Sequence, residues 1–228
     1  MNERGKMLAG KIYDPFTEGL PEERTRAHVL CKMYNETTEV DVEKRNEILA
    51  ELMPNRHESA YLQGPIYFDF GKNIKMGRNS YANFNFTALD ICEITIGDNV
   101  FIGPNVSLLT PLHPLCWQDR NPYFNEKTGN VTDREYGAPI TIGDNCWIAG
   151  NVTVCAGVTI GEGCVIGAGS VVTRDIPANS LAFGNPCRVS RRITDADRLE
   201  NHPELFCKSG AIASRNYKGV PDALKSGI

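Results

Sequence analysis

Four histidines are the side chains of this sequence that take up a proton most readily near neutral pH: His28, His57, His113 and His202. His28 and His57 fall within or beside segments with a helical pattern, and His202 lies in a polar C-terminal stretch. His113 lies in a stretch rich in Pro, Asn, Asp and Gly, and regularly spaced aliphatic residues both precede and follow this stretch. Long irregular loops on a regular scaffold often carry function. From the residues alone, His113 is either a general base or a solvent-exposed loop histidine.

Arginines and cysteines are the other side chains that could bind a ligand or react. Arg188, Arg191 and Arg192 form a basic cluster whose forked guanidinium groups suit phosphate oxygens, and the alternative is a solvated surface cluster. The eight cysteines contain no CxxC pair. Because the N-terminus lacks the apolar core of a secretory signal, we interpret them as free thiols of a cytoplasmic protein.

Composition argues against several classes of protein. The 228 residues include 24 basic and 28 acidic side chains, and the net charge of −4 is unlike that of a nucleic-acid-binding protein. The sequence has no stretch of about 18 apolar residues, so we expect no membrane association. With 41% apolar residues the chain can form a packed core, and its length fits one domain, or one large domain with a small appendage.

A six-residue period predicts the scaffold that positions these residues. Aliphatic side chains recur without a break at Ile142, Ile148, Val154, Ile160, Ile166 and Val172. This period fits neither a helix nor an alternating strand, but it fits a short strand followed by a tight corner. Three such steps would close one turn of a parallel β-solenoid. Cys146 and Cys164, 18 residues apart, would then stack in its core as apolar filler.

The same period occurs earlier in the chain. Ile96, Ile102 and Leu108 keep it, and a degenerate set at residues 76–88 precedes them with a two-residue slip. The period disappears between Leu108 and Ile140. We therefore predict a solenoid over residues 61–190 with one long extruded loop at about 109–139.

Two segments lie outside the repeat. Apolar stripes at helical spacing predict helices within residues 20–53, closed by Pro54, so that residues 1–60 form an N-terminal helical cap. Residues 191–228 form a polar tail in which Thr194 caps a short predicted helix. From residue 201 onward no pattern is evident.

The repeat and its flanking motifs resemble the maltose/galactoside O-acetyltransferases, a family of hexapeptide-repeat acyltransferases. The resemblance covers about residues 6–200, and its motifs include Ala9-Gly10-Lys11-Ile12-Tyr13, Tyr81-Ala82-Asn83, His113-Pro114 and Gly184-Asn185-Pro186-Cys187-Arg188-Val189. It implies a mainly β fold, a left-handed parallel β-helix, whose hand periodicity alone does not predict. It also implies acetyl transfer from acetyl-CoA to a sugar hydroxyl, a homotrimer with active sites between subunits, and no metal.

The resemblance also implies roles for individual residues. His113 would accept the hydroxyl proton, Asn83 would donate a hydrogen bond near the reacting centre, and Glu135 would orient His113. Glu126 is an alternative to Glu135, because this loop is longer than in typical relatives.

Acceptor and coenzyme contacts are implied in the same way. Carboxylates suit sugar hydroxyls, and the acceptor-binding positions are Asn83, Asp14, Asp69 and Asp90. Small residues allow the pantetheine arm to lie against the wall, and arginines suit the nucleotide phosphates. The positions implied for coenzyme A are Asn83, Trp147, Gly150, Ala168, Thr173, Arg174, Arg188 and Arg191.

Three alternative functions compete with acetyl transfer to a sugar. A γ-class carbonic anhydrase on the same solenoid needs three zinc-binding histidines, but three of the four histidines here lie outside the predicted solenoid. A non-catalytic scaffold has no need for His113, Asn83 and the arginines together. Acetylation of another acceptor, such as an antibiotic, an amino sugar or a nucleotide sugar, stays open because fold and donor do not determine the acceptor.

Overall fold

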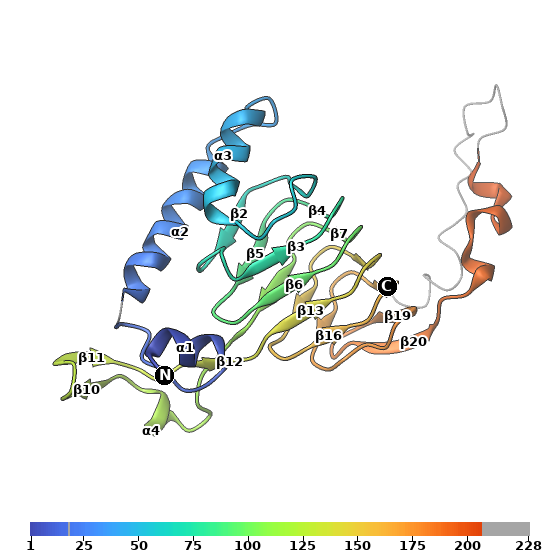
Figure 1. Ribbon diagram of the computed structural model, residues 1–228. Helices are drawn as coiled ribbons and strands as arrows, with labels where there is room; N and C mark the ends of the chain where they lie inside the picture. The colour runs from blue at the N-terminus through green and yellow to red at the C-terminus, as the bar shows by residue number, and fades with distance from the viewer. Residues whose placement is uncertain (18, 207–228) are drawn as a thin grey trace.

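Three β-sheets, parallel except for the last strand of one of them, form the walls of a solenoid in the computed structural model, which describes residues 1–17 and 19–206 (Figure 1). The five-stranded wall contains β2 (Ile66–Phe68), β5 (Phe86–Leu89), β8 (Ser107–Leu109), β15 (Thr153–Val154) and β18 (Val171–Val172). The four-stranded wall contains β3 (Ile74–Met76), β6 (Ile94–Ile96), β13 (Ile140–Ile142) and β16 (Thr159–Ile160). The seven-stranded wall contains β1 (Tyr61–Leu62), β4 (Tyr81–Ala82), β7 (Phe101–Ile102), β14 (Trp147–Ile148), β17 (Val165–Ile166), β19 (Ser180–Phe183) and β20 (Arg188–Arg192).

The six-residue period places one aliphatic side chain in the core at each step. All six residues of the uninterrupted run from Ile142 to Val172 have no exposed surface. At one corner of successive coils, residues adopt positive φ, a conformation that Asn and Gly tolerate: Asn85, Asn105 and Asn151 have φ of 58°, 58° and 59°. Their side-chain amides form a ladder from coil to coil, with N–O distances of 2.9 and 3.1 Å.

The two cysteines predicted to stack do lie on successive coils. Strands β14 and β17 pair with Trp147 opposite Val165, so the preceding residues, Cys146 and Cys164, are also neighbours. Both are buried free thiols, and each donates its S–H to a backbone carbonyl at 3.1 Å. They are apolar filler with satisfied weak donors, as the period predicted.

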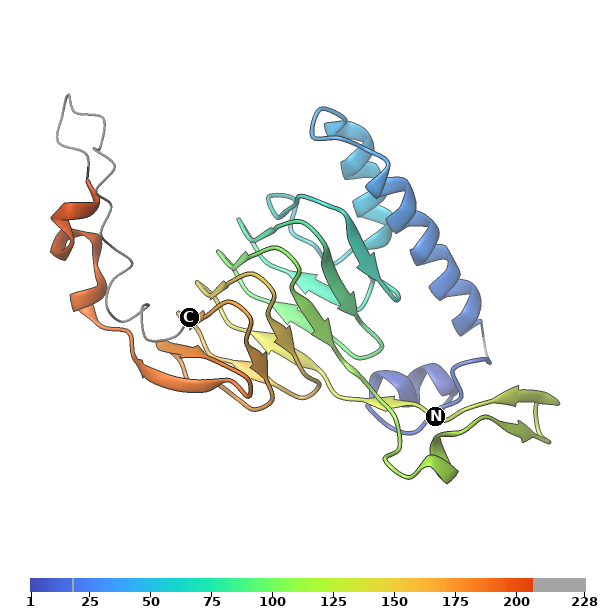
Figure 2. The ribbon, with the colours of Figure 1, turned by 180° about the vertical axis from the view of Figure 1, so that it is seen from behind.

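The extruded loop leaves the solenoid after β8 and returns to it at β13. It contains β9 (Pro111–Leu112), the helical turn α4 (Trp117–Arg120), the hairpin strands β10 (Tyr123–Asn125) and β11 (Asn130–Thr132), and β12 (Tyr136–Gly137). Ile140 pairs directly with Ile94, so the stacking of the coils continues across the insertion. Figure 2 shows the hairpin projecting beside α1 (Glu3–Leu8), away from the C-terminal segment.

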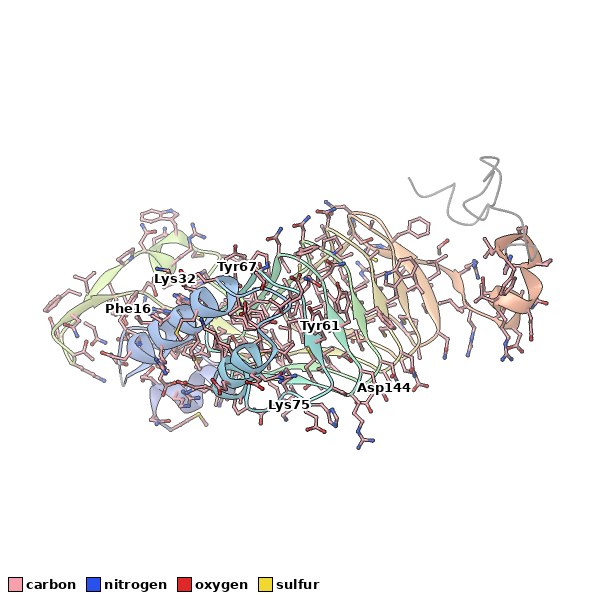
Figure 3. The ribbon with its side chains drawn as sticks, turned by 90° about the horizontal axis from the view of Figure 1, so that it is seen from above. Phe16, Lys32, Tyr61, Tyr67, Lys75 and Asp144 are labelled. Carbon is pink, nitrogen blue, oxygen red and sulfur yellow. The ribbon has the colours of Figure 1, made fainter. Side chains whose placement is uncertain are left out.

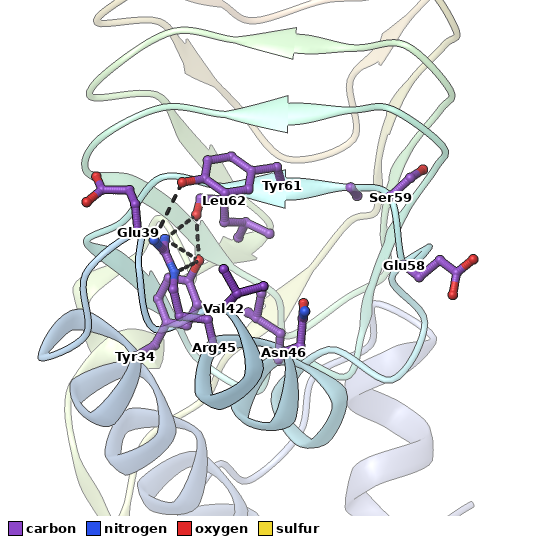
Figure 4. Close-up of a pocket in the computed structure, with 11 residues that line it drawn as sticks. Tyr34, Glu39, Val42, Arg45, Asn46, Glu58, Ser59, Tyr61 and Leu62 are labelled. Carbon is purple, nitrogen blue, oxygen red and sulfur yellow. Dashed lines mark hydrogen bonds between the residues drawn. The ribbon is translucent and has the colours of Figure 1, made fainter.

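Helices α2 (Leu20–Asn35) and α3 (Val42–Leu52) cover the first coil (Figure 1). The buried Arg45 joins the cap to the solenoid, because its guanidinium donates to the backbone oxygen of Leu62 at 2.6 Å and to the hydroxyl of Tyr34 (Figure 4). It also donates to the backbone oxygen of Gln63 at 2.8 Å. The guanidinium carbon also lies 4.6 Å from the centre of the Tyr34 ring, a cation–π contact. Within the described residues, no helix is long and apolar enough to cross a membrane.

The described part of the chain, up to residue 206, finishes in an arm beyond the last coil. Strand β20 pairs antiparallel with β19, and three 3₁₀ turns follow: η1 (Asp195–Asp197), η2 (Leu199–Asn201) and η3 (Pro203–Leu205). The short helix predicted after Thr194 is therefore a single 3₁₀ turn, in which the Thr194 N–H donates to Asp197 at 2.9 Å. The rest of the predicted tail, residues 207–228, lies outside the described residues.

Candidate active site

The root of the extruded loop brings His113 and Glu135 together. Strands β9 and β12 pair antiparallel with Leu112 opposite Tyr136, so the residues just beyond this pair face each other. His113 Nε2 lies 3.9 Å from Glu135 Oε1, and His113 Nδ1 lies 3.4 Å from the backbone oxygen of Arg134. The side chain of His113 is 48% exposed and that of Glu135 only 13%. A solvent-accessible imidazole thus lies beside a largely buried carboxylate.

Tyr13 holds the carboxylate of Glu135 in place. The backbones of the two residues form an isolated antiparallel bridge, with Tyr13 N donating to Glu135 O at 3.0 Å, and the Tyr13 hydroxyl donates to Glu135 Oε2. Burial raises the pKa of Glu135, and the Tyr13 hydrogen bond and the nearby His113 oppose that rise. Burial and the charge of Glu135 raise the pKa of Tyr13, so Tyr13 remains a donor. Glu126, the alternative to Glu135, is exposed between β10 and β11.

Replacement of Glu135 by glutamine is expected to separate activity from stability. Loss of the anion beside the imidazolium formed during proton transfer should lower kcat by about tenfold. The raised pKa of Glu135 means that folding favours its protonated form, so the ionised carboxylate costs stability above the pKa of an unfolded glutamate. The melting temperature at pH 8 should therefore stay constant or rise. Unchanged kcat, or a fall in both kcat and melting temperature, would contradict this role.

Asp14 is buried and anchors the hairpin of the extruded loop. Its Oδ1 accepts hydrogen bonds from the Thr132 hydroxyl at 2.5 Å and from the Phe16 N–H at 3.0 Å. Its Oδ2 accepts a hydrogen bond from Asn125 Nδ2 at 3.1 Å. These contacts connect β10 and β11 to the N-terminal segment that carries Tyr13. In this structure Asp14 therefore positions the loop.

Replacement of Asp14 by alanine should loosen the hairpin. Removing the acceptor leaves the buried Thr132 hydroxyl without this partner, at a cost of about 1–3 kcal/mol. We expect faster amide hydrogen exchange at residues 123–132 with little change in the solenoid strands. Thr132→Val removes only one of the three donors and should give a smaller effect. Equal exchange in the hairpin of Asp14→Ala and of the unaltered protein would rule out the anchor.

The other two carboxylates implied for the acceptor occupy different environments. Asp69 has an 18% exposed side chain, its Oδ1 lies 3.9 Å from His28 Nε2, and burial raises its pKa. Its charge also raises the pKa of Glu135, which places the two carboxylates in the same electrostatic neighbourhood. Asp90 has no exposed surface and accepts hydrogen bonds from Phe70 N at 2.8 Å and Asn73 N at 3.2 Å. Burial raises the pKa of Asp90 to about 7.

Asn83 lies on another wall of the solenoid. It follows β4 on the seven-stranded wall, whereas His113 follows the five-stranded wall. The Asn83 Oδ1 accepts a hydrogen bond from the Phe84 N–H at 2.7 Å, so its side-chain NH₂ is the group left to donate. Among the described residues no hydrogen bond joins Asn83 to His113 or Glu135. One chain therefore brings His113 and Glu135 together but leaves Asn83 apart.

The positions implied for coenzyme A fall into two groups. Trp147, Gly150 and Ala168 lie in or after β14 and β17 on the seven-stranded wall, and the Trp147 side chain is half exposed. The backbones of Gly103 and Gly150, on neighbouring coils, lie so close there that a Cβ atom on Gly103 would be only 2.6 Å from Gly150 N. Thr173, Arg174 and Arg188 are exposed near the last coil. The Arg191 guanidinium forms a bidentate ion pair with Asp197, in which Nη1 donates to Oδ2 at 2.9 Å and Nη2 donates to Oδ1 at 2.6 Å. This pair lowers the pKa of Asp197 to about 2.

Sequence reasoning missed the role of Tyr13. The residue was noted only as part of a motif, and its partner Glu135 is 122 positions away. No local pattern predicts an isolated bridge over that separation; the tyrosine directly before Asp14 is the one available signal. Within the described residues, no group of three or more His, Cys, Asp and Glu side chains is placed to hold a metal ion.

Comparisons with known proteins agree with this architecture. A profile described as "Maltose acetyltransferase hexapeptide capping motif" matches residues 6–55, and one described as "Bacterial transferase hexapeptide (six repeats)" matches residues 139–174. The chain is 46% identical over 198 residues to the galactoside O-acetyltransferase of Escherichia coli (strain K12), covering 87% of this chain and 92% of that relative.

Two solved structures show the same fold. A maltose O-acetyltransferase from Clostridium difficile 630 is 44% identical with a TM-score of 0.75, over 86% of this chain and 99% of that one. A galactoside acetyltransferase in complex with coenzyme A is 41% identical with a TM-score of 0.77, over 94% of this chain and 100% of that one. The predicted fold class, a left-handed parallel β-helix with N-terminal helices and an extruded loop, is confirmed. The chain belongs to the maltose/galactoside O-acetyltransferase family of hexapeptide-repeat acyltransferases.

Proposed function

We propose that this protein transfers the acetyl group of acetyl-CoA to a hydroxyl of a galactoside or maltose-type sugar. The observation that carries the proposal is the accessible His113 imidazole 3.9 Å from the buried Glu135 carboxylate, which Tyr13 in turn holds. An alcohol is a poor nucleophile until a base removes its proton as the new bond forms. Relatives named for galactoside and maltose acetylation support the sugar acceptor, and a neighbour with bound coenzyme A supports the donor. The use of acetyl-CoA also fits a cytoplasmic enzyme.

Each residue of the proposed site has a defined task. His113 accepts the proton of the acceptor hydroxyl while the hydroxyl oxygen attacks the thioester carbonyl carbon. Glu135 stabilises the imidazolium that forms, and the Asn83 NH₂ donates to the developing oxyanion. When the carbon–sulfur bond breaks, the proton on His113 passes to the coenzyme A sulfur. The products are an O-acetylated sugar and free thiol.

The site is completed by a second copy of the chain. Asn83 and His113 lie on different walls, so in one copy the donor and the base do not face one acetyl group. A closed homotrimer would place the seven-stranded wall of one subunit beside the loop root of the next. His113 and Glu135 would then come from one subunit, and Asn83 from its neighbour.

The exposure of the candidate side chains decides which of them we assign to each substrate. We assign the acceptor sugar to Asp69, the partly exposed carboxylate near Glu135, and the pantetheine arm to the seven-stranded wall at Trp147, Gly150 and Ala168. Arg174 and Arg188, with Thr173, are placed for the phosphates, and Arg191 would have to exchange Asp197 for a phosphate. Asp14 and Asp90, whose oxygens accept internal hydrogen bonds, serve by positioning the loop and the Asp69 turn.

An acceptor panel tests the function. Purified protein is incubated with acetyl-CoA and with galactosides, maltose, amino sugars or an aminoglycoside, and free thiol and product are followed by a thiol reagent and NMR. We expect one thiol released for each O-acetyl group formed on a galactoside or maltose. Binding of coenzyme A without transfer to any hydroxyl would contradict the proposal, and transfer to an amine alone would assign a different acceptor.

A further inference from the structure

Arg134 connects the hairpin of the extruded loop to the active-site histidine. It follows strand β11 by two residues and directly precedes Glu135. Figure 3 shows the hairpin at the end of the molecule opposite the C-terminal arm. The proposed chemistry uses none of the hairpin's side chains, yet the chain returns from the hairpin directly to Glu135.

The side chain of Arg134 has two partners in the loop. Its guanidinium carbon lies 4.2 Å from the centre of the Tyr123 ring, in the first strand of the hairpin. A guanidinium group at this distance over an aromatic face forms a cation–π contact. Arg134 Nη1 also donates to the backbone oxygen of Asp119, in α4, at 3.3 Å. The side chain thus ties the end of the hairpin to its first strand and to the helical turn before it.

The backbone of the same residue faces the proposed base. His113 Nδ1 lies 3.4 Å from the Arg134 backbone oxygen. Because a carbonyl oxygen only accepts hydrogen bonds, this contact requires the hydrogen of the neutral imidazole to be on Nδ1. Nε2, which lies 3.9 Å from Glu135 Oε1, is then free to accept the hydroxyl proton. Catalytic hydrogen bonds are often this long in a free enzyme and shorten when substrate binds.

The peptide group between Arg134 and Glu135 is held from two sides. Its N–H, that of Glu135, donates to the backbone oxygen of Tyr13 at 3.4 Å, as part of the isolated bridge. On the other side, the Arg134 side chain is held by the Tyr123 ring and by α4. Removing that side chain takes away one of these two holds, so the carbonyl is expected to move relative to the imidazole.

A second arginine braces the chain on the other side of His113. Arg120 Nη1, in α4, donates to the backbone oxygens of Pro114 and Leu115, both at 3.3 Å. The residue before Arg120 supplies the backbone oxygen that Arg134 binds. One connected set of contacts therefore holds both the segment after His113 and the carbonyl beside its Nδ1.

We propose that Arg134 is a positioning residue whose side chain, held by the Tyr123 ring and by α4, fixes the backbone oxygen that sets the tautomer and orientation of His113. This inference rests on the proposed function and gives the hairpin a task in it. The other tautomer would place a hydrogen on Nε2, where the base needs its lone pair. The hairpin therefore contributes to catalysis without touching either substrate.

The test combines turnover with NMR of protein labelled with ¹⁵N at its histidines. The ring-nitrogen shifts distinguish the two tautomers, and the His113 signals are identified by their loss in His113→Ala. At a pH where the imidazole is neutral, we expect the Nδ1–H form to dominate in the unaltered protein. Arg134→Ala should raise the share of the Nε2–H form and lower kcat about tenfold, with KM for both substrates nearly unchanged. Arg26→Ala, which removes an exposed arginine paired with Glu51 on the helical cap, is the matched control and should change neither readout.

Two variants of Tyr123 test the ring itself. Tyr123→Phe keeps the aromatic face, so it should retain most of the rate and the tautomer of the unaltered protein. Tyr123→Leu keeps an apolar side chain but removes the face, so it should act in the same direction as Arg134→Ala. Adding Tyr123→Leu to Arg134→Ala should lower kcat little further, because both changes break the same contact.

The outcomes separate this inference from the proposed function. An unchanged kcat and tautomer in Arg134→Ala would overturn the positioning role and leave the acetyltransferase intact. A lower kcat with the Nδ1–H form retained, or equal effects of Tyr123→Phe and Tyr123→Leu, would overturn it as well. Acetylation of no hydroxyl would overturn the proposed function, and the tautomer shift, which needs no turnover, would still decide whether Arg134 positions His113.

Discussion

Replacement of His113 by alanine is expected to lower kcat by about 10²- to 10⁴-fold, the usual contribution of a positioned general base. The affinity for acetyl-CoA should stay unchanged, because the coenzyme positions lie on other parts of the solenoid. The melting temperature should also stay close to that of the unaltered protein, since the imidazole is 48% exposed and its polar contacts are long, 3.4 Å to the backbone oxygen of Arg134 and 3.9 Å to Glu135. Loss of rate without loss of fold or donor binding identifies a catalytic role.

The measurement is steady-state thiol release, combined with calorimetric titration of coenzyme A. His57→Ala is the matched control, because His57 lies at the junction of cap and solenoid with its Nδ1 2.9 Å from the Ser59 hydroxyl. That variant should keep full activity. Thiol release in His113→Ala at the rate of the unaltered protein would exclude His113 as the base.

Replacement of Asn83 by aspartate should lower kcat by about 10²- to 10³-fold, the range found when one donor to an oxyanion is removed. The substitution keeps a side-chain oxygen for the Phe84 N–H, whose hydrogen bond of 2.7 Å orients the native amide. It replaces the NH₂ donor by an acceptor and adds a negative charge where negative charge develops. The effect should fall on kcat, with KM for the acceptor changing much less.

Asn83→Ala provides the control for charge in that experiment. It removes the donor without adding a carboxylate, so its kcat should also fall by about 10²-fold, to a level at or above that of Asn83→Asp. A kcat within a few-fold of the unaltered protein in both variants would show that Asn83 makes no hydrogen bond to the oxyanion.

The solenoid was predictable because its repeat is local. Each step from Ile142 to Val172 carries its own core residue and its own corner, so a window of six residues holds all the information needed. The two-residue slip before Ile96 corresponds to a longer coil in the structure. Ile74 pairs with Ile94 and Ala82 with Ile102, so these coils have 20 residues where three six-residue steps give 18. The left hand of the coil came only from family resemblance, because the period is the same for either hand.

The active-site surroundings were less predictable because they depend on tertiary contacts across long separations. The bridge from Tyr13 to Glu135 joins the N-terminal segment to the end of the loop, and the Asp14 anchor reaches Thr132 across a similar distance. The sequence does not distinguish an aspartate that binds a sugar hydroxyl from one, such as Asp14, that accepts a hydrogen bond from a threonine of the same chain. Only the fold shows that its oxygens already accept internal hydrogen bonds.

Complementation between inactive variants tests the central claim most directly, namely that His113 of one subunit and Asn83 of its neighbour serve one acetyl transfer. His113→Ala and Asn83→Ala carry different tags, are co-expressed, and are purified through both tags in sequence. Every trimer that carries both tags contains both variants, so one of its three sites, about a third, pairs an intact His113 with an intact Asn83. We predict about a third of the unaltered activity, far above either variant alone. Hybrids no more active than the separate variants would contradict a site shared between subunits.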